Sequence, residues 1–538
     1  MCCVSRFLPY SVALQTLTVR SRRAAPRTNR GGSVRSSVSA GPTSGRAVIP
    51  RRSRKPLGSR RIGRKSIVAA AALAVALPLL SACGSDYSPG VINFYTPADG
   101  AATFAKIGDR CSAESNGEYE VVTTTLPKNA DDQRVQLARR LAGNDKGLDL
   151  MAMDVVWTAE FADAGWAVAV PDALAAKVKA QTLGGPLDTA TWRKKGEDTE
   201  RLFAIPMSTN TQLLWYRKDV LRRIGQGGRP ATNWEGMLAN AQESGALRPP
   251  GPTYIMVQGK QYEGLMVWFN SVLASAGGEV VSPDDPSKVT LTDTPEHRAA
   301  TVRALEILKA VATAPGADPS LTNSDEGASR TGMEKGQAIY QVNWPFVFAG
   351  MQGNAALGAV PFLKNELTPF ANLFDAEGSA KDSTTPEQLA PLNAKMRQIF
   401  DFAQYPGVGD RPSKTTLGGF NIAVAGTSAQ KDLAFKAAEC ITTLRSQRQF
   451  ALEAGPPPVI GAIYDDPEFR AAYPMADDVK VQLQSDRAAT RPKSPVYQAI
   501  STLITARLSP VGKWDPQTMA DELADVVQKA INGEGLIP

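Results

Sequence analysis

The stretch LDLMAMD, residues 148 to 154, restricts the possible folds of this chain more than any other segment. It is apolar at almost every position, whereas a strand with one face in water alternates apolar and polar residues. Such a run is typical of a strand buried on both faces, usually in a parallel sheet. The strand-like stretch GVINFYT (90 to 96) and the amphipathic, helix-like stretch DDQRVQLARRLAG precede it. This alternation predicts α/β architecture.

The first 82 residues differ in composition from the rest of the chain. They contain 16 of the 60 Lys and Arg residues and none of the 53 Asp and Glu residues, which leaves the remainder with a net charge of about −9. A basic segment rich in Ser, Pro and Gly cannot bury enough apolar surface to fold. The basic isoelectric point of the whole chain therefore comes from this segment. A nucleic-acid-binding function would need a basic face on the folded part, so we expect no nucleic-acid partner.

Residues 59–82 have the pattern of a secretory signal peptide, because the charged stretch RRIGRKS is followed by the short apolar stretch IVAAAALAVALPLL. Signals of this kind begin a chain. Residues 1–58 are therefore interpreted as an over-called translation start or a disposable extension, and the alternative is a genuine basic tail. SRRIGRK also weakly resembles a twin-arginine signal, which would imply export of a folded protein.

The signal-like segment ends in LSACG, residues 80 to 84, which resembles a bacterial lipobox. In a lipobox the cysteine is lipidated and becomes the mature N-terminus; the alternative is an ordinary buried cysteine after an apolar helix. We predict lipidation of Cys83 and a short tether over residues 83–89. Two or more acyl chains give stable anchoring. The protein is thus expected to be exported and anchored to the outer face of the cell membrane.

Cysteine and histidine usage limits the available chemistry. After Cys83 the chain contains only Cys111 and Cys440, which are compatible with one long-range disulfide in an oxidising compartment. The sequence leaves open whether they pair. The single histidine, His297, is expected at the surface in the first turn of a helix. With so few ligands, no metal site and no cofactor are expected.

Signatures of enzymes are scarce in the sequence. It contains no phosphate-binding loop, nucleophile elbow or zinc-protease motif, and no convincing dinucleotide fingerprint. The chain is therefore predicted not to be an enzyme. Catalysis by paired carboxylates stays open, because the separation of two carboxylates is invisible in sequence.

The mature chain of about 456 residues is too long for one core. No long low-complexity linker divides it, so the chain is expected to cross between two lobes more than once, as in hinged binding proteins. One helix is predicted to start at PATNWEGML, with Thr232 and Glu235 at capping-box spacing. The predicted boundaries are 90–206 and 361–460 for the first lobe, and 207–360 with the C-terminal helices of 461–538 for the second lobe.

Polar and aromatic residues follow several of the apolar stretches. Asp154 ends LDLMAMD, and the carboxyl ends of parallel strands face the ligand crevice of α/β folds; its alternative role is a helix N-cap. Asn210 lies between two apolar strands, as expected at a lobe crossover. Glu326 and Trp344 flank a predicted helix, which allows both to face one cleft, although core packing is the commoner fate of a lone Trp.

Five stretches occur in the order found in the extracellular sugar-binding proteins of ABC importers, of the maltose and trehalose type, which this chain resembles. They are AIPMSTNTQLLWYRKDVL, QYEGLMVWFNSVLASAGGEV, EGASRTGMEKGQAIYQVNWPF, LGGFNIAV and RPKSPVYQAIS. With the lipobox and INFYTPADGAATF, the chain is most similar to trehalose-binding lipoproteins of mycobacterial importers. The resemblance implies a two-lobe, periplasmic-binding-protein-like α/β fold with a hinge and an interlobe ligand cleft. It also implies a disaccharide ligand, trehalose ahead of a maltose-like glucoside, and ABC permease subunits as partners.

Carried over residue by residue, the resemblance implies a set of ligand contacts. They are Asp154, Asn210, Glu326, Trp344 and Arg491, with Asp99, Glu263, Trp268, Gly418 and Gly419 less secure. Relatives often have an acid at the position of Asn210. Carboxylates accept sugar hydroxyls, Arg donates to them, and an aromatic ring packs against a pyranose face. A secreted glycoside hydrolase and a surface adhesin remain open as alternatives.

Overall fold

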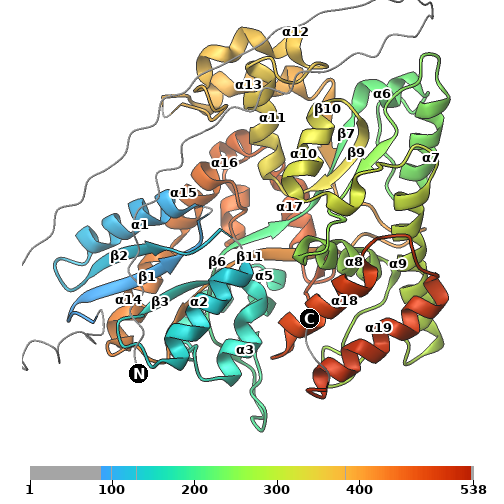
Figure 1. Ribbon diagram of the computed structural model, residues 1–538. Helices are drawn as coiled ribbons and strands as arrows, with labels where there is room; N and C mark the ends of the chain where they lie inside the picture. The colour runs from blue at the N-terminus through green and yellow to red at the C-terminus, as the bar shows by residue number, and fades with distance from the viewer. Residues whose placement is uncertain (1–86, 99, 129, 382, 535–538) are drawn as a thin grey trace, which may run out of the picture. The chain divides into compact units, whose positions relative to one another are not determined.

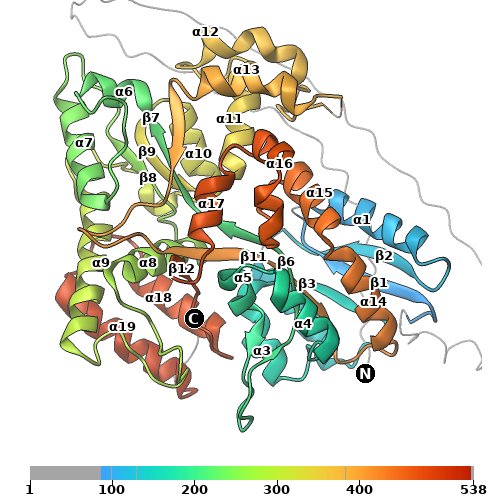
Figure 2. The same cartoon turned by 180° about the vertical axis from the view of Figure 1, so that it is seen from behind.

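The computed structural model describes residues 87–98, 100–128, 130–381 and 383–534. The predicted extension, the signal peptide, Cys83 and Asp99 lie outside the described residues. The described residues form two larger sheets with helices packed on them (Figures 1 and 2). None of the described helices is both long enough and apolar enough to cross a membrane. The predicted α/β architecture is confirmed.

The first sheet is six-stranded and is assembled from distant parts of the chain. Its order is β12-β11-β3-β1-β2, with β6 paired to β11 as well. β3 has a parallel neighbour, β1, as LDLMAMD predicted, and an antiparallel neighbour, β11, which the pattern did not predict. The strands are β1 (Val91–Thr96), β2 (Glu120–Thr125), β3 (Leu150–Asp154), β6 (Ile205–Thr211), β11 (Thr415–Val424) and β12 (Ala488–Ala489).

We call the first sheet and the helices packed around it the first lobe. Its amphipathic helix α2 buries Gln133, Leu137 and Leu141, which recur every four residues and so lie on one face. A small hairpin, β4 (Thr191–Trp192) with β5 (Arg201–Leu202), also belongs to this lobe. The helices are α1 (Ala101–Glu114), α2 (Ala130–Ala142), η1 (Val155–Trp157), α3 (Thr158–Asp163), α4 (Asp172–Gln181), α5 (Gly184–Thr189), α14 (Lys431–Ile441) and α15 (Leu444–Ala454).

The second sheet has the order β10-β7-β9-β8 and is covered on both faces. Leu214 and Tyr216 of β7 pack into one apolar cluster, while Leu213 and Trp215 pack into another on the opposite face. Because successive side chains of a strand point to opposite faces, this double burial explains why LLWYR lacks polar alternation. The strands are β7 (Leu213–Arg217), β8 (Tyr254–Met256), β9 (Ala338–Asn343) and β10 (Phe400–Ala403).

The second sheet and its helices form what we call the second lobe. The C-terminal helices α18 and α19 pack on α8 and α9 (Figure 1). The helices of this lobe are α6 (Lys218–Arg223), α7 (Trp234–Ala246), α8 (Glu263–Ala276), α9 (Pro295–Thr313), η2 (Leu321–Asn323), α10 (Glu326–Glu334), α11 (Phe346–Ala356), α12 (Lys364–Leu367), η3 (Thr368–Leu373), α13 (Pro386–Met396), η4 (Gly461–Asp465), α16 (Pro467–Ala472), α17 (Ala476–Gln482), α18 (Tyr497–Leu508) and α19 (Pro516–Ile531).

The chain passes between the two sheets at defined places. Only Gln212 separates β6 of the first sheet from β7 of the second, and the chain returns between β10 and β11. The predicted boundaries assigned all of 361–460 to the first lobe, but β10 pairs with β7 of the second sheet. The rings of Phe400 and Phe402 each lie 5.9 Å from the Trp215 ring, so packing around this indole holds β10 there.

The predicted start of the helix in PATNWEGML is displaced by one residue. The N-cap of α7 is Asn233, whose side chain accepts a hydrogen bond from the Gly236 amide at 2.9 Å, so the predicted capping box of Thr232 and Glu235 is wrong. Asn is at least as good an N-cap as Thr. Glu235 instead accepts a hydrogen bond from Arg303 at 2.6 Å.

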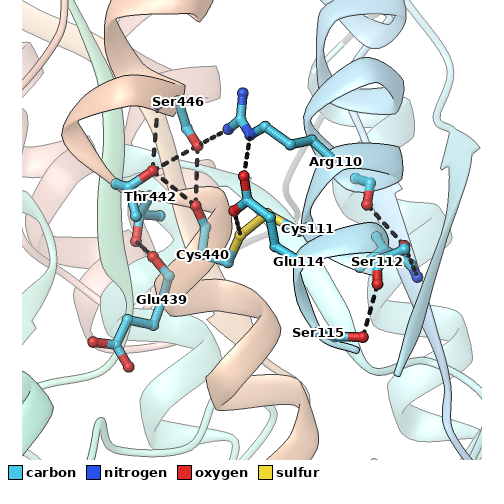
Figure 3. The surroundings of a disulfide bond; sticks show 12 residues. Arg110, Cys111, Ser112, Glu114, Ser115, Glu439, Cys440, Thr442 and Ser446 are labelled. Atoms are coloured by element: carbon cyan, nitrogen blue, oxygen red, sulfur yellow. Dashed lines mark hydrogen bonds and ion pairs between the residues drawn. A yellow bond between two sulfur atoms is a disulfide. The ribbon is translucent and has the colours of Figure 1, made fainter. Parts of the chain in front are cut away.

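A disulfide joins Cys111 on α1 to Cys440 on α14 (Figure 3). The two cysteines are 329 residues apart in sequence, so the bond connects an early helix of the first lobe to one that follows the return from the second lobe. Beside it, Arg110 donates to Ser446 at 2.5 Å (Figure 3). The covalent bond and this hydrogen bond both hold the C-terminal helices of the first lobe against α1.

Replacing both cysteines, Cys111→Ala with Cys440→Ala, is expected to lower the free energy of unfolding by about 3 kcal/mol. The reason is that a cross-link between distant residues restricts the unfolded chain. Urea unfolding, followed with and without reductant, measures the effect. Reductant should lower the wild-type midpoint and leave that of the variant unchanged. Equal midpoints for the two oxidised proteins would contradict a stabilising role.

Candidate functional site

Arg491 connects the two lobes through a pair of carboxylates. Its guanidinium donates to Asp154 Oδ1 at 2.9 Å and to Glu263 Oε1 at 2.7 Å. Asp154 ends β3 of the first lobe, and Glu263 is the first residue of α8 in the second lobe. The Arg491 side chain is only 4% exposed. Burial lowers the pKa of this guanidinium, but the facing Asp154 carboxylate and Glu263 raise it above its usual value overall, so Arg491 stays charged.

Both carboxylate oxygens of Glu263 are occupied. Oε1 accepts from Arg491 and from the Tyr497 hydroxyl, and Oε2 accepts from Ser501 at 2.6 Å. Burial raises the pKa of Glu263, against the lowering effect of Arg491 and of these hydrogen bonds. Burial, followed by the Glu263 charge, also raises the pKa of Tyr497. Glu263 therefore serves to hold Arg491, and its oxygens have little capacity left for a ligand.

Asp154 fills both of the roles that the sequence allowed. Its Oδ1 accepts from the Val156 amide at 3.1 Å, which caps η1, and also from Arg491. Its Oδ2 accepts no hydrogen bond from any described residue. One oxygen of this carboxylate is therefore structural, while the other is available to a donor.

Glu326 and Trp344 are brought together by Asn343. The Asn343 amide donates to the main-chain oxygen of Glu326 at 3.0 Å, and its oxygen accepts from the Trp344 amide at 2.9 Å. Glu326 Oε2 accepts from the Tyr262 hydroxyl at 2.7 Å, while Oε1 accepts from no described residue. Burial and then the Glu326 charge raise the pKa of Tyr262, so Tyr262 remains a donor to this carboxylate.

Trp344 lies over a glycine of β11. A Cβ placed on Gly418 would come within 3.4 Å of the Trp344 ring and within 3.2 Å of the Asn210 Cβ. Asn210 pairs with Gly418 across the β6–β11 ladder, and its Oδ1 is buried and accepts no hydrogen bond from the described residues. Gly418 thus allows the indole and Asn210 to approach each other.

Glycine is required at position 419 for a different structural reason. Its φ is +118°, and a Cβ there would lie 2.3 Å from the Ser208 carbonyl oxygen. Only a residue without a side chain fits this conformation and this distance. In this structure both glycines serve the approach of protein groups.

Strand β11 brings the two groups of residues near each other. Its Phe420 pairs with Asp154 of β3, and its Gly418 pairs with Asn210 of β6. The two β11 positions are about 7 Å apart, because a strand rises about 3.3 Å per residue. A cavity of about 20 Å³ lies beside Arg491 and is lined by Val155 and Leu417 among others. That volume is enough for about one water.

Two of the predicted contacts are taken up by other parts of the protein, and a third cannot be placed in the described structure. Trp268 is fully buried in the core of the second lobe, with its ring 6.1 Å from that of Trp234. Asp99 lies outside the described residues, and Glu263 is taken up by protein donors. His297 is in the first turn of α9, as predicted. Among the described residues, no cluster of His, Cys, Asp or Glu could hold a metal ion.

Four polar residues that support the site were not predicted from the sequence. They are Tyr262, Asn343, Tyr497 and Ser501. Tyr262, Tyr497 and Ser501 each donate a hydrogen bond to a carboxylate of the site. All four residues lie in the stretches that carry the family resemblance, within ten residues of a predicted ligand contact. The sequence marks them only as polar residues near a predicted contact, and such residues are too common to identify a functional role.

Comparison with known proteins places this geometry in a family. Residues 98–448 match the model of the bacterial extracellular solute-binding protein family. A protein of Deinococcus radiodurans described as "Probable ABC transporter-binding protein" is 25% identical over 365 residues, which cover 65% of this chain and 71% of the relative.

Solved structures of low identity share the fold. Maltose-bound MalE3 of T. maritima is 21% identical with a TM-score of 0.61, covering 82% of this chain and 99% of that chain. The acarbose-binding GacH receptor of Streptomyces glaucescens is 18% identical with a TM-score of 0.60, covering 84% and 100%. The two-lobe, periplasmic-binding-protein-like fold expected from the sequence is confirmed.

The chain therefore belongs to the bacterial extracellular solute-binding proteins. Proteins of this family bind solutes and do not convert them, in agreement with the prediction that the chain is not an enzyme. Because the family match carries this conclusion, the hydrolase alternative is set aside.

Replacing Arg491 with Met is expected to destabilise the protein by about 3 kcal/mol at pH 7.5, because Glu263 and Asp154 are left partly buried and uncompensated. Burial without Arg491 raises the pKa of Glu263 further above its unfolded value. A group with a raised folded pKa adds stability at low pH and loses it as pH rises through that pKa. The deficit should therefore shrink between pH 7.5 and pH 5, as measured by urea unfolding at both values.

Lys493→Met is the matched control, since Lys493 lies on the same segment and pairs with Asp188 at 2.9 Å. The carboxylate of that pair is 45% exposed, so its loss should cost less than about 1 kcal/mol at either pH. A deficit in Arg491→Met that is the same at both pH values would argue against a buried, uncompensated carboxylate.

Proposed function

We propose that the protein captures a neutral disaccharide, with trehalose as the first candidate, and delivers it to the permease subunits of an ABC importer. Membership of the solute-binding family supports the general role. The observation that carries the sugar assignment is the set of acceptor atoms with no donor among the described residues. They are Asp154 Oδ2, Glu326 Oε1 and Asn210 Oδ1.

These atoms favour a ligand rich in hydroxyl groups. Each is an oxygen acceptor, and two belong to carboxylates, which form the stronger, charge-assisted hydrogen bonds. Asn210 Oδ1 is buried, and a buried acceptor without a partner costs about 1–3 kcal/mol. A sugar hydroxyl would recover that cost. Among the described residues, the cation paired with Asp154 is Arg491, which is shared with Glu263, and no ion pair involves Glu326, so an anionic solute would meet net negative charge.

The partly exposed Trp344 ring supports the same ligand class. Its edge rests on the bare backbone of Gly418, which supports the ring without side chains. The C–H face of a pyranose is apolar and packs on an indole, while its hydroxyls point outward to polar groups. Carboxylates around an aromatic platform therefore suit the two-sided character of a pyranose.

Binding requires the lobes to separate and close. A disaccharide needs a site of several hundred cubic ångströms, whereas the cavity beside Arg491 holds about 20 Å³. We propose that the Arg491 contacts to Asp154 and Glu263 open to admit the sugar and that closure encloses it. A permease could then recognise the closed form, which the ligand favours by population shift.

The exported, membrane-anchored state completes the proposal. Lipidation of Cys83 after removal of residues 59–82 would hold the protein at the outer face of the membrane, beside its permease. The predicted lobe boundaries are proposed with two changes: α12, η3, α13 and β10 move to the second lobe, and all of β6 moves to the first.

Calorimetric titration of the purified protein with trehalose, maltose, sucrose and glucose tests the proposal. Trehalose is expected to bind and to raise the melting temperature in a concentration-dependent way. Trp344→Ala should weaken affinity about tenfold or more, since loss of an aromatic contact of about 1.5 kcal/mol corresponds to such a factor. Glu326→Gln should also weaken it, because a charged acceptor becomes neutral.

Trp514→Ala serves as a control. Trp514 lies between α18 and α19 and is a partly buried indole that donates to the Leu508 carbonyl oxygen at 2.9 Å. Its loss should lower the melting temperature and leave the sugar affinity unchanged. If the protein bound maltose and not trehalose, maltose would become the proposed ligand, and the proposed role in import would stand. An absence of binding by all four sugars would overturn the substrate class.

A further inference from the structure

A glutamine of α17 connects two of the segments that cross between the lobes, namely the β6–β7 crossover and the return from β10 to β11. Gln482 Nε2 donates to Thr211 Oγ1 at 2.9 Å and to the Gln212 carbonyl oxygen at 3.0 Å. Its Oε1 accepts from the Tyr405 amide at 2.5 Å. Thr211 and Gln212 form the β6–β7 crossover, and Tyr405 lies near the start of the return from β10 to β11. One side chain thus contacts both crossovers.

The network extends to the far end of the return segment. Thr211 Oγ1 donates to Thr415 Oγ1 at 3.3 Å, and Thr415 is the first residue of β11. Gln212 in turn donates to Gln258 at 2.8 Å. The polar groups of both crossovers are therefore connected through Gln482, which lies about 270 residues after the first crossover in sequence.

Gln482 is fixed to the second lobe. Val479 of α17 and Leu483, the residue that follows this helix, are fully buried in the core cluster that contains Trp215. Gln482 itself is 1% exposed, and both amide hydrogens and the oxygen are used. A buried amide with all its hydrogen bonds made is costly to displace, because each lost partner leaves a desolvated group. The Gln482 side chain therefore holds the two crossover segments in fixed positions.

The return segment has room to move on its other side. A groove of about 700 Å³ is lined by Gln404, Tyr405, Gly409 and Arg411 of this segment, and by Asp478 of α17. A segment packed against protein on both sides could not change its backbone angles. On the inner side the Tyr405 ring packs 5.9 Å from that of Trp234, while on the groove side hydrogen bonds restrain the segment, and Gln482 supplies one of these bonds.

We propose that Gln482 is a positioning residue of the hinge. It keeps the two crossovers in one mutual arrangement, so that the lobes close by a single concerted rotation, and it increases solute affinity without touching the solute. Loss of these bonds would leave the crossovers to be ordered during closure, and this entropy cost reduces affinity. The effect on affinity rests on the proposed function, whereas the effect on the crossovers rests on the fold alone.

Gln482→Met tests the proposal, because Met preserves the buried volume and removes all three hydrogen bonds. We expect the trehalose dissociation constant to rise at least fivefold. We also expect faster hydrogen exchange at the Thr415 amide, which donates to the Arg487 carbonyl and not to Gln482. Its exchange therefore reports movement of the return segment. A second variant, Gln482→Glu, keeps the acceptor for Tyr405, removes both donors and should weaken affinity likewise.

Gln133→Met is the matched control. Gln133 is also a buried glutamine, 5% exposed, and donates to the Pro127 carbonyl at 2.8 Å within the first lobe. It should lower the melting temperature while changing the dissociation constant and Thr415 exchange less than twofold. Gln482 variants that match this control in both readouts would overturn the proposal. If the wild type binds no sugar, the proposed function fails, and Thr415 exchange alone decides the role of Gln482.

Discussion

The pairing of β11 with β3 and β6 is the interaction on which the rest of the structure depends. β11 is the strand by which the chain returns to the first sheet after building most of the second lobe. Inserted between β3 and β6, it positions the start of the β6–β7 crossover and the end of the return from β10. The left-handed backbone at Gly419 and the irregular register after Phe420 let it follow both neighbours. Any side chain at position 419 would push β6 away and disturb the crossover that follows it.

The second constraint is the balance of charge around Arg491. A buried guanidinium is tolerated because two carboxylates from different lobes face it, and Glu263 is in turn satisfied by Tyr497 and Ser501. Such a group adds little net stability, since desolvation offsets much of the attraction. What matters for function is the position of Arg491. It lies at the junction of the lobes, so any movement of one lobe against the other must remake its bonds.

Much of the site could be predicted, but the role of each residue could not. The resemblance selected Asp154, Glu326 and Trp344, and the structure connects the last two through Asn343. The resemblance also selected Trp268, which the structure buries in the core. A Trp in an apolar helix looks the same in sequence whether it faces a ligand or a core. Only the neighbouring element, here α7 with its own Trp234, distinguishes the two cases.

The sequence by itself determined the elements of the fold and their class. The apolar run LDLMAMD predicted a strand buried on both faces, the amphipathic stretch DDQRVQLARRLAG predicted a helix, and the absence of acidic residues distinguished the composition of residues 1–82 from that of the rest. These are local properties, set by side-chain periodicity and composition. Tertiary structure alone decided that β10 joins the second sheet, that Cys111 meets Cys440, and that Gln482 reaches both crossovers. Each of these depends on residues tens to hundreds of positions apart, and their contacts arise only when the packed cores bring the elements together.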